Sequence, residues 1–246
     1  MNSLLNIGKR FLYDLVSYAE YNAKILLEPS VVELCGIKIA VSRNFTRSVK
    51  SAFYRRVYEM SEAKCVREKI NTEDVVLEIG AGIGFVSSLC SKLIGSEKVF
   101  SYEANPALIP LIRKTYTMNS VNPTLINAFV GARMGFVSFY LEKDFPMSSC
   151  IRRSPNSEEI KVLCLDVNEE ILRIKPSFVI IDVEGGEFEL VPSMNLDAVQ
   201  KVLIELHERI IGRKKVDVVR SYFTKCGFTV DTTVSTASEL LLERLP

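Results

Sequence analysis

Apolar runs of strand length alternate with amphipathic stretches of helical length along most of the chain. The apolar runs lie at 75–79, 98–102, 124–130, 160–165, 177–181 and 201–206, with an alternating run at 136–141 that indicates an inserted strand or hairpin. Helical patterns lie at 86–94, 106–118, 167–174 and 214–226, and two strand patterns at 228–232 and 240–244 close the chain. This order predicts an α/β fold: a mostly parallel seven-stranded sheet, helices on both faces and a terminal antiparallel hairpin.

The N-terminal part of the chain has a different pattern. It predicts an amphipathic helix at 3–27, a hairpin at 31–41 and a helix reaching residue 69 that Thr46 or Ser48 caps. We expect residues 1–70 to form a helical and hairpin extension packed on the core, and residues 71–246 to form the main domain. The first helix is expected to cover the core or a second copy of the chain, which would give a homo-oligomer. A helix lying on a membrane surface is the alternative.

A glycine-rich turn follows the strand at 75–79 and suggests a nucleotide-binding corner. Gly80, Gly82 and Gly84 are spaced G-x-G-x-G, whereas dinucleotide-binding proteins use G-x-G-x-x-G. Glu103 ends the next strand, about 20 residues later, where a carboxylate accepts ribose hydroxyls. Glu78 would repel a pyrophosphate but suits a ligand with an ammonium group, such as S-adenosylmethionine. A turn that serves only tight packing is the alternative.

Composition narrows the class of protein. The chain has 246 residues, of which 48% are hydrophobic and 25% charged, which is typical of a globular domain. Lys and Arg number 31 against 30 Asp and Glu, so no basic excess favours nucleic acid. The six cysteines form no C-x-x-C pair and the chain has one histidine, so none of the usual spacings of zinc ligands is present. No apolar run is long enough to span a membrane and no signal-peptide pattern is present, which favours a cytoplasmic location.

Acidic residues gather where two further apolar strands end. The run from Asp182 through Glu184 to Glu187 follows one strand, and Glu205 with His207 ends the next. The carboxyl ends of parallel strands share one edge, so these groups are expected to meet there. An acceptor hydroxyl would need a base, for which Asp182, His207 and Glu184 are candidates. The same cluster could instead bind a divalent cation, and Glu187 is expected to cap a helix.

Several motifs together resemble the FkbM-like family of S-adenosylmethionine-dependent methyltransferases. They are Leu-Glu-Ile-Gly-Ala-Gly-Ile-Gly at 77–84, Tyr-Glu-Ala-Asn-Pro at 102–106, Asn-Ala-Phe-Val-Gly at 127–131, Asp-Val-Glu-Gly-Gly-Glu at 182–187 and Ile-Glu-Leu-His at 204–207, with Tyr58-Glu59 before the core. The resemblance implies the Rossmann-like class I methyltransferase fold and O-methylation of a hydroxyl on a sugar, glycolipid or small metabolite. Glu78 stands where many members have aspartate.

The resemblance also implies roles for individual residues. The expected cofactor-binding residues are Tyr58, Glu78, Gly80, Ala81, Gly82, Gly84, Glu103, Ala104, Asn127, Ala128 and Asp182. The glycine turn would hold the methionyl part, Glu103 the ribose hydroxyls and Asn127 the adenine, while Asp182 would face the reaction centre. Small-molecule or glycan acceptors are therefore the expected partners.

Two other functions stay open at this stage. RNA methylation is disfavoured, because amino-methyltransferases acting on nucleic acid place Asn/Asp-Pro-Pro-aromatic where this chain has Asp-Val-Glu-Gly at 182–185. Cytosine C5 enzymes need a nucleophilic cysteine, and none follows that strand. A catalytically inactive binding or scaffold protein is the second alternative, and the intact glycine turn and Glu103 argue against it.

Overall fold

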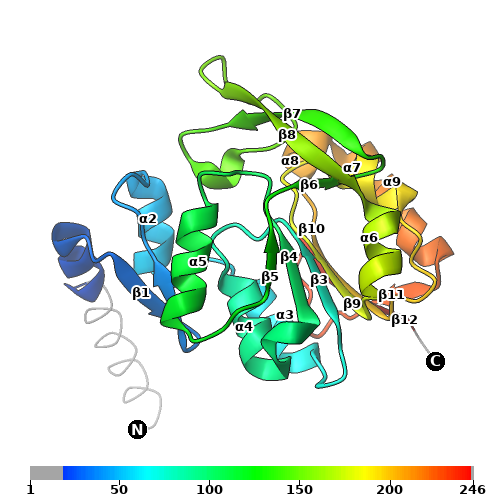
Figure 1. Cartoon of the computed structure of the whole chain (residues 1–246), viewed down its shortest axis with the longest axis horizontal. Coiled ribbons are helices and arrows are strands. Elements are labelled where there is room, and N and C mark those ends of the chain that lie inside the picture. Colours follow the sequence, from blue (N-terminus) through cyan, green and yellow to red (C-terminus); the bar gives the residue numbers. More distant parts are fainter. Residues whose placement is uncertain (1–18, 245–246) are drawn as a thin grey trace, which may run out of the picture.

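A seven-stranded sheet forms the centre of the computed structural model, which describes residues 19–244 (Figure 1). Its strands, in spatial order, are β11 (Phe228–Val230), β12 (Glu239–Arg244), β10 (Lys201–Glu205), β9 (Phe178–Ile181), β3 (Val76–Ile79), β4 (Val99–Tyr102) and β5 (Thr124–Ile126). The pairs from β10 to β5 are parallel, and β12 is antiparallel to both of its neighbours. The predicted α/β fold and terminal hairpin are thus confirmed.

Helices cover both faces of this sheet. They are α3 (Met60–Lys69), α4 (Phe85–Ile94) and α5 (Ile109–Met118) on one face, and α6 (Val167–Ile174), α7 (Glu187–Leu190), α8 (Glu208–Ile211) and α9 (Arg213–Lys225) toward the other face and the rim. The period-2 alternation of the strands divides the core accordingly. Val76 and Ile180 belong to the hydrophobic cluster under α4, whereas Leu77 and Ile181 belong to the cluster under α6 and α9.

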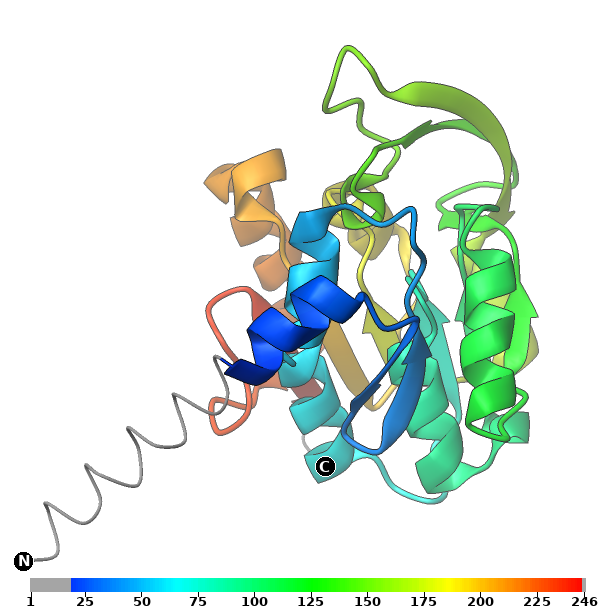
Figure 2. The same cartoon turned by 90° about the vertical axis from the view of Figure 1, so that its left-hand side faces the viewer.

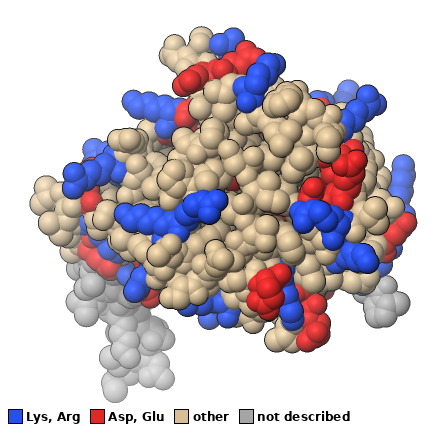
Figure 3. Space-filling view, viewed as in Figure 1, with Lys and Arg blue, Asp and Glu red and all other residues tan. Residues whose placement is uncertain are grey.

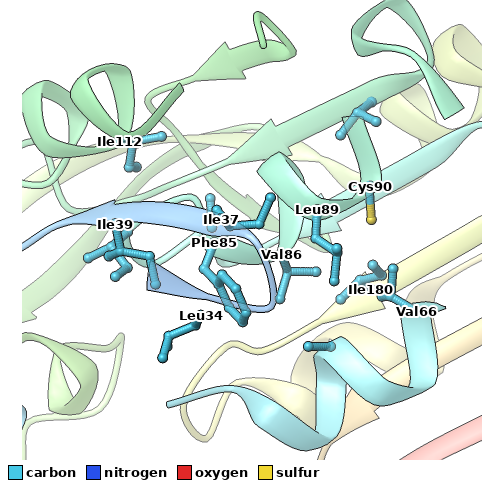
Figure 4. Packing of buried hydrophobic residues seen from close by; sticks show 14 of the residues in the cluster. Leu34, Ile37, Ile39, Val66, Phe85, Val86, Leu89, Cys90, Ile112 and Ile180 are labelled. Atoms are coloured by element: carbon cyan, nitrogen blue, oxygen red, sulfur yellow. The ribbon is translucent and has the colours of Figure 1, made fainter. Parts of the chain in front are cut away.

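The cluster under α4 also contains the N-terminal hairpin, β1 (Val31–Leu34) and β2 (Ile37–Ala40). Figure 4 shows part of it, with Leu34 of the hairpin, Phe85 of α4 and Ile112 of α5. Backbone N–H groups of the hairpin donate to side chains in and just after α5: Lys38 N to Asn119 Oδ1 at 2.9 Å and Ala40 N to Thr115 Oγ1 at 3.2 Å.

The prediction of a single helix up to residue 69 is wrong. Thr46 does cap a helix, accepting from Val49 N, but α2 (Arg47–Tyr54) ends after two turns and α3 begins separately. Arg56 and Glu59 between them take left-handed backbone conformations, with φ of 58° and 46°. Of the amphipathic helix expected at 3–27, residues 19–27 are helical, and the rest lies outside the described residues.

The strand expected at 124–130 is also two strands. β5 belongs to the central sheet, whereas β6 (Phe129–Gly131) joins β8 (Glu158–Asp166) and β7 (Gly135–Leu141) in a three-stranded sheet. This inserted sheet, with β7 antiparallel to β8, stands above the edge of the central sheet in Figure 2. Within residues 19–244, no helix has the length and apolar character needed to cross a membrane.

Candidate active site

A cavity of about 270 Å³ lies at the carboxyl edge of the parallel strands. Its walls come from the break between α2 and α3, the ends of β3, β4, β9 and β10, and the inserted sheet. The sequence-predicted residues that line it are Tyr58, Gly80, Gly82, Glu103, Ala104, Ala128, Asp182 and Glu184. Those absent from its lining are Glu78, Ala81, Gly84, Asn127 and His207. The topology therefore brings the two halves of the predicted site together.

The glycine turn gives the cavity its floor. Gly80 has φ of 96°, and a Cβ there would lie 1.8 Å from the backbone oxygen of Asp182, so the turn and the end of β9 touch through main chain. Gly82 has φ of 55°, and a Cβ there would lie 2.9 Å from the hydroxyl of Tyr58. At both positions neighbouring atoms already occupy the place of a Cβ, so only glycine allows the turn to pack this closely.

Three other residues of the motif serve packing rather than the cavity wall. Gly84 begins α4 with φ of 77°, and a Cβ there would lie 2.8 Å from Ile112 and Tyr116. Ala81 is buried, with its backbone N–H donated to the oxygen of Tyr102. Glu78 points to the α4 face, as the alternation of β3 requires, and only 2% of it is exposed. Burial raises the pKa of Glu78 to about 7.

Glu103 lines the cavity from the end of β4, as the sequence predicted. Its Oε2 accepts from Gly82 N at 2.8 Å and its Oε1 from Asn105 N at 2.7 Å. Burial raises the pKa of Glu103 to about 7, although these backbone donors lower it. Asn127 lies behind it and donates to the backbone oxygens of Glu103 at 2.7 Å and Ala104 at 3.3 Å. Asn127 therefore fixes the loop that carries Glu103.

Tyr58 and Glu59 enter the cavity because the helix is broken before α3. The Tyr58 ring packs on Phe53, with centroids 4.5 Å apart, which aims its hydroxyl at the glycine turn. Burial raises the pKa of Tyr58 and of Glu59 well above their ordinary values. An unbroken helix could not present both side chains to one cavity in this way.

His207 lies at the centre of the acidic cluster, after the end of β10 rather than in the strand as expected. Its Nδ1 contacts Glu187 Oε1 at 2.6 Å, and Glu187 is fully buried. Its Nε2 lies 3.3 Å from Glu184 Oε2, 3.6 Å from Glu205 Oε1 and 3.8 Å from Asp182 Oδ1. Burial alone would lower the pKa of His207, but the surrounding carboxylates raise it to about 11.

The carboxylates of this cluster differ in their surroundings. Burial and the charges of Glu184 and Glu205 raise the pKa of Asp182 well above its usual range. Burial would also raise the pKa of Glu184, but His207 and Arg153 bring it below its ordinary value. Asp182 Oδ1 is buried without a hydrogen-bond partner among the described residues.

Sequence reasoning missed part of this site. Glu187 accepts from Gly185 N before α7, close to its expected capping role, but its bond to His207 was not foreseen. Arg153, from the loop between β7 and β8, donates to the backbone oxygen of Glu184 at 2.6 Å and to its Oε2 at 2.8 Å. Glu239 of β12 lines the cavity although no motif surrounds it. Long-range packing brings these residues in, so no local pattern could reveal them.

The strand order, the glycine turn after β3 and the carboxylate at the end of β4 together define a Rossmann-like methyltransferase that depends on S-adenosylmethionine. The sequence profile of a family described as "Methyltransferase FkbM domain" matches residues 78–230, more than half of the chain. The chain belongs to this family.

Individual relatives are distant or short. The chain is 37% identical over 65 residues to "Probable ribosomal RNA small subunit methyltransferase A" of Thermococcus onnurineus (strain NA1), which is 26% of this chain and 23% of that protein. A methyltransferase from Pyrococcus furiosus has a similar structure, with a TM-score of 0.48, 14% identity and 97% of each chain covered. Precorrin-6y C5,15-methyltransferase from Geobacter metallireducens GS-15 gives a TM-score of 0.46 at 16% identity, covering 83% of this chain and 91% of that one.

Proposed function

We propose that this enzyme methylates a hydroxyl of a neutral or cationic acceptor: a sugar, a glycolipid or a small metabolite. The acidic composition of the cavity wall carries the proposal. Its ionisable acidic residues are Glu59, Glu62, Glu103, Asp182, Glu184, Glu205 and Glu239, and no Lys, Arg or His occurs among the described residues that line it. Acidic side chains form hydrogen bonds with hydroxyls in either protonation state. Those that stay ionised, such as Glu184 with its lowered pKa, attract ammonium groups and repel phosphates.

The residues of the cavity floor fit the expected cofactor. Gly80 and Gly82 both line the cavity, so a ligand there would meet main chain rather than side chains, next to the Tyr58 hydroxyl. Glu103 stands at the distance along the chain where a carboxylate holds ribose hydroxyls. When bound, S-adenosylmethionine supplies a methyl group carried on a sulfonium, and the bond between methyl carbon and sulfur breaks with its electron pair left on sulfur. The protein's task is to align the acceptor oxygen and to remove its proton.

We assign proton removal to Asp182 rather than His207. Asp182 lines the cavity with 30% of its side chain exposed, whereas the side chain of His207 is 12% exposed and lies behind the carboxylates. Proton transfer needs the base within hydrogen-bond reach of the hydroxyl, and only a residue in the wall meets that condition. His207, held by Glu187, is assigned the positioning of this carboxylate cluster.

RNA methylation is the competing function, since one relative is named as a ribosomal RNA enzyme. An RNA substrate would bring several phosphates toward the acidic wall, and affinity for nucleic acid normally rests on Lys and Arg contacts. On the face drawn in Figure 3, Lys and Arg are interspersed with Asp and Glu rather than gathered into one basic field. We therefore favour a small or glycan acceptor. Of the extension expected at 1–70, residues 19–70 are described, and we propose that they close the cavity through Tyr58 and Glu59.

A transfer assay with S-adenosylmethionine labelled in its methyl group tests this function. The full-length protein is incubated with a panel of polyols, hexoses, amino sugars and glycolipids, and in parallel with ribosomal RNA lacking modifications. We expect label in a hydroxylated acceptor, abolished in Asp182→Asn, and none in RNA. Label in RNA would contradict the proposed acceptor class and identify RNA as the acceptor. Binding of S-adenosylhomocysteine with no transfer to any member of either panel would favour the binding or scaffold function.

A further inference from the structure

We propose that Asp182, Glu205 and His207 bind one divalent cation of the Mn²⁺ type at the acceptor end of the cavity. The inference deepens the proposed function, and the chemical role of the cation rests on that function. Binding of the cation, however, is measurable without turnover. One imidazole with carboxylates suits a first-row ion such as Mn²⁺ better than Ca²⁺, which takes oxygen ligands alone, or a structural zinc, which favours sulfur and several histidines.

The spacing of the ligand atoms is the first observation. One nitrogen of His207 and one oxygen each of Asp182 and Glu205 lie within 4.8 Å of one another. The individual separations from His207 Nε2 are 3.8 Å to Asp182 and 3.6 Å to Glu205. Both exceed the upper end of ordinary N–H···O hydrogen bonds, about 3.2 Å. The carboxylate oxygen nearest to Nε2 is Glu184 Oε2 at 3.3 Å, which Arg153 also contacts at 2.8 Å. Ligands about 2.1 Å from a six-coordinate ion lie about 3 Å apart at neighbouring positions and about 4 Å apart at opposite ones.

The orientation of the imidazole is the second observation. His207 Nδ1 contacts Glu187 Oε1 at 2.6 Å, and the Glu187 side chain is 0% exposed. A metal-binding histidine commonly donates its other ring N–H to a carboxylate in this way, which fixes the ring and raises its basicity. Nε2 is thereby directed to the same space as the two carboxylates.

The hydrogen bonding of the carboxylates is the third observation. Asp182 Oδ1 is buried and has no hydrogen-bond partner within the described part of the chain. Buried polar atoms are rarely left unpaired, because desolvation without compensation is costly. Glu184 differs, since Arg153 already neutralises it at 2.8 Å. The Asp182 oxygen without a hydrogen-bond partner thus lies 3.8 Å from His207 Nε2, a separation that two ligands of one ion can take.

The position of the site gives the cation a role. Asp182 and Glu205 line the cavity, and three protein ligands leave coordination positions open toward it. A divalent cation lowers the pKa of a hydroxyl that it contacts, so the acceptor would lose its proton to Asp182 more readily. The cation would also orient the hydroxyl oxygen toward the cofactor methyl group.

The site is tested by titrating the chelator-treated, full-length protein with Mn²⁺ and measuring free and bound ion by electron paramagnetic resonance. We expect saturable binding of one ion per chain, weakened at least about tenfold in His207→Gln and Glu205→Gln, and about 10- to 100-fold in Glu187→Gln. Glu243→Gln is the matched control and should bind as wild type, since this carboxylate pairs with Lys69 and does not line the cavity. Absence of saturable binding, or binding unchanged in His207→Gln, would overturn the proposal.

Two further variants locate the ion. Glu62 and Glu239 also bring carboxylate oxygens close to Glu205. Loss of Mn²⁺ binding in Glu62→Gln and Glu239→Gln, with binding kept in His207→Gln, would place the ion there and overturn the proposed ligand set. S-adenosylhomocysteine binding is measured for every variant. If S-adenosylhomocysteine still binds and methylation does not depend on the cation, the cation site is rejected and the proposed function stands. If the wild type does not bind S-adenosylhomocysteine, the proposed function itself is rejected.

Discussion

The two ends of the cavity are built on different physical grounds. The cofactor end rests on backbone: Gly80 and Gly82 allow main chain and Tyr58 to meet at distances that a Cβ would forbid. The acidic end rests on charge: His207 lies among carboxylates from separate segments, and Arg153 reaches it from the inserted sheet. We conclude that substitutions at the cofactor end should act through sterics and folding, and those at the acidic end through chemistry.

The largest expected effect is that of Gly80→Ala. The new Cβ would lie 1.8 Å from the Asp182 backbone oxygen, and the residue keeps φ of 96°, so β3 and β9 would have to separate. We expect a loss of unfolding free energy of about 4 kcal/mol or more, measured by urea denaturation. Gly36→Ala is the matched control, since Gly36 also has positive φ of 79° but has no atom within 4 Å of a Cβ. It should cost about 1–2 kcal/mol, the penalty of a left-handed conformation alone. Equal losses would show that the close approach does not matter.

Asp182→Asn should act on turnover rather than on folding. The amide keeps the shape of the side chain but cannot accept the acceptor's proton, so we expect kcat to fall about 10²- to 10⁴-fold. S-adenosylhomocysteine affinity should change by no more than about threefold, since the variant leaves the glycine turn intact. Steady-state kinetics on the acceptor identified by the transfer assay, with calorimetry for binding, separates the two quantities. An unchanged kcat would show that Asp182 is not the base.

Glu78→Gln should stabilise the protein at alkaline pH. The pKa of Glu78 is about 7 in the folded chain against an ordinary 4.5, so folding favours its protonated form. Its raised pKa stabilises the fold below about pH 4.5, and this contribution is lost as pH rises through 7. The variant should therefore gain up to about 3 kcal/mol over wild type at pH 8 and much less at pH 5, in denaturation curves at both values. A gain independent of pH would contradict the burial of an ionising group.

Asn127→Ala should have the smallest effect. If the amide only holds the backbone oxygens of Glu103 and Ala104, unfolding free energy and S-adenosylhomocysteine binding should each lose about 1 kcal/mol. A direct contact with adenine, as the family resemblance implies, would instead weaken binding by well over tenfold with little effect on stability. Thermal denaturation and calorimetry on one preparation distinguish these results.

The sequence predicted the cofactor end better than the acidic end for a physical reason. The floor of the cavity is a contiguous turn, so its glycines and the following Glu103 form a local pattern. Side-chain alternation also explains why Glu78 does not line the cavity, since it points to the α4 face of the sheet. Arg153 and Glu239 reach the site through tertiary packing, and the break before Tyr58 follows from left-handed residues that carry no glycine signal. Strand order had to be known before these residues could be placed.

Calorimetric titration with S-adenosylhomocysteine, comparing wild type and Glu103→Ala, tests the central claim most directly. Glu68→Ala, which removes an exposed carboxylate of α3, is the matched control. The cofactor site described above predicts saturable one-to-one binding by wild type and Glu68→Ala, and at least about 100-fold weaker binding by Glu103→Ala, because a buried acceptor of the ribose hydroxyls is lost. No binding by the folded wild type, or equal affinity in Glu103→Ala, would contradict it.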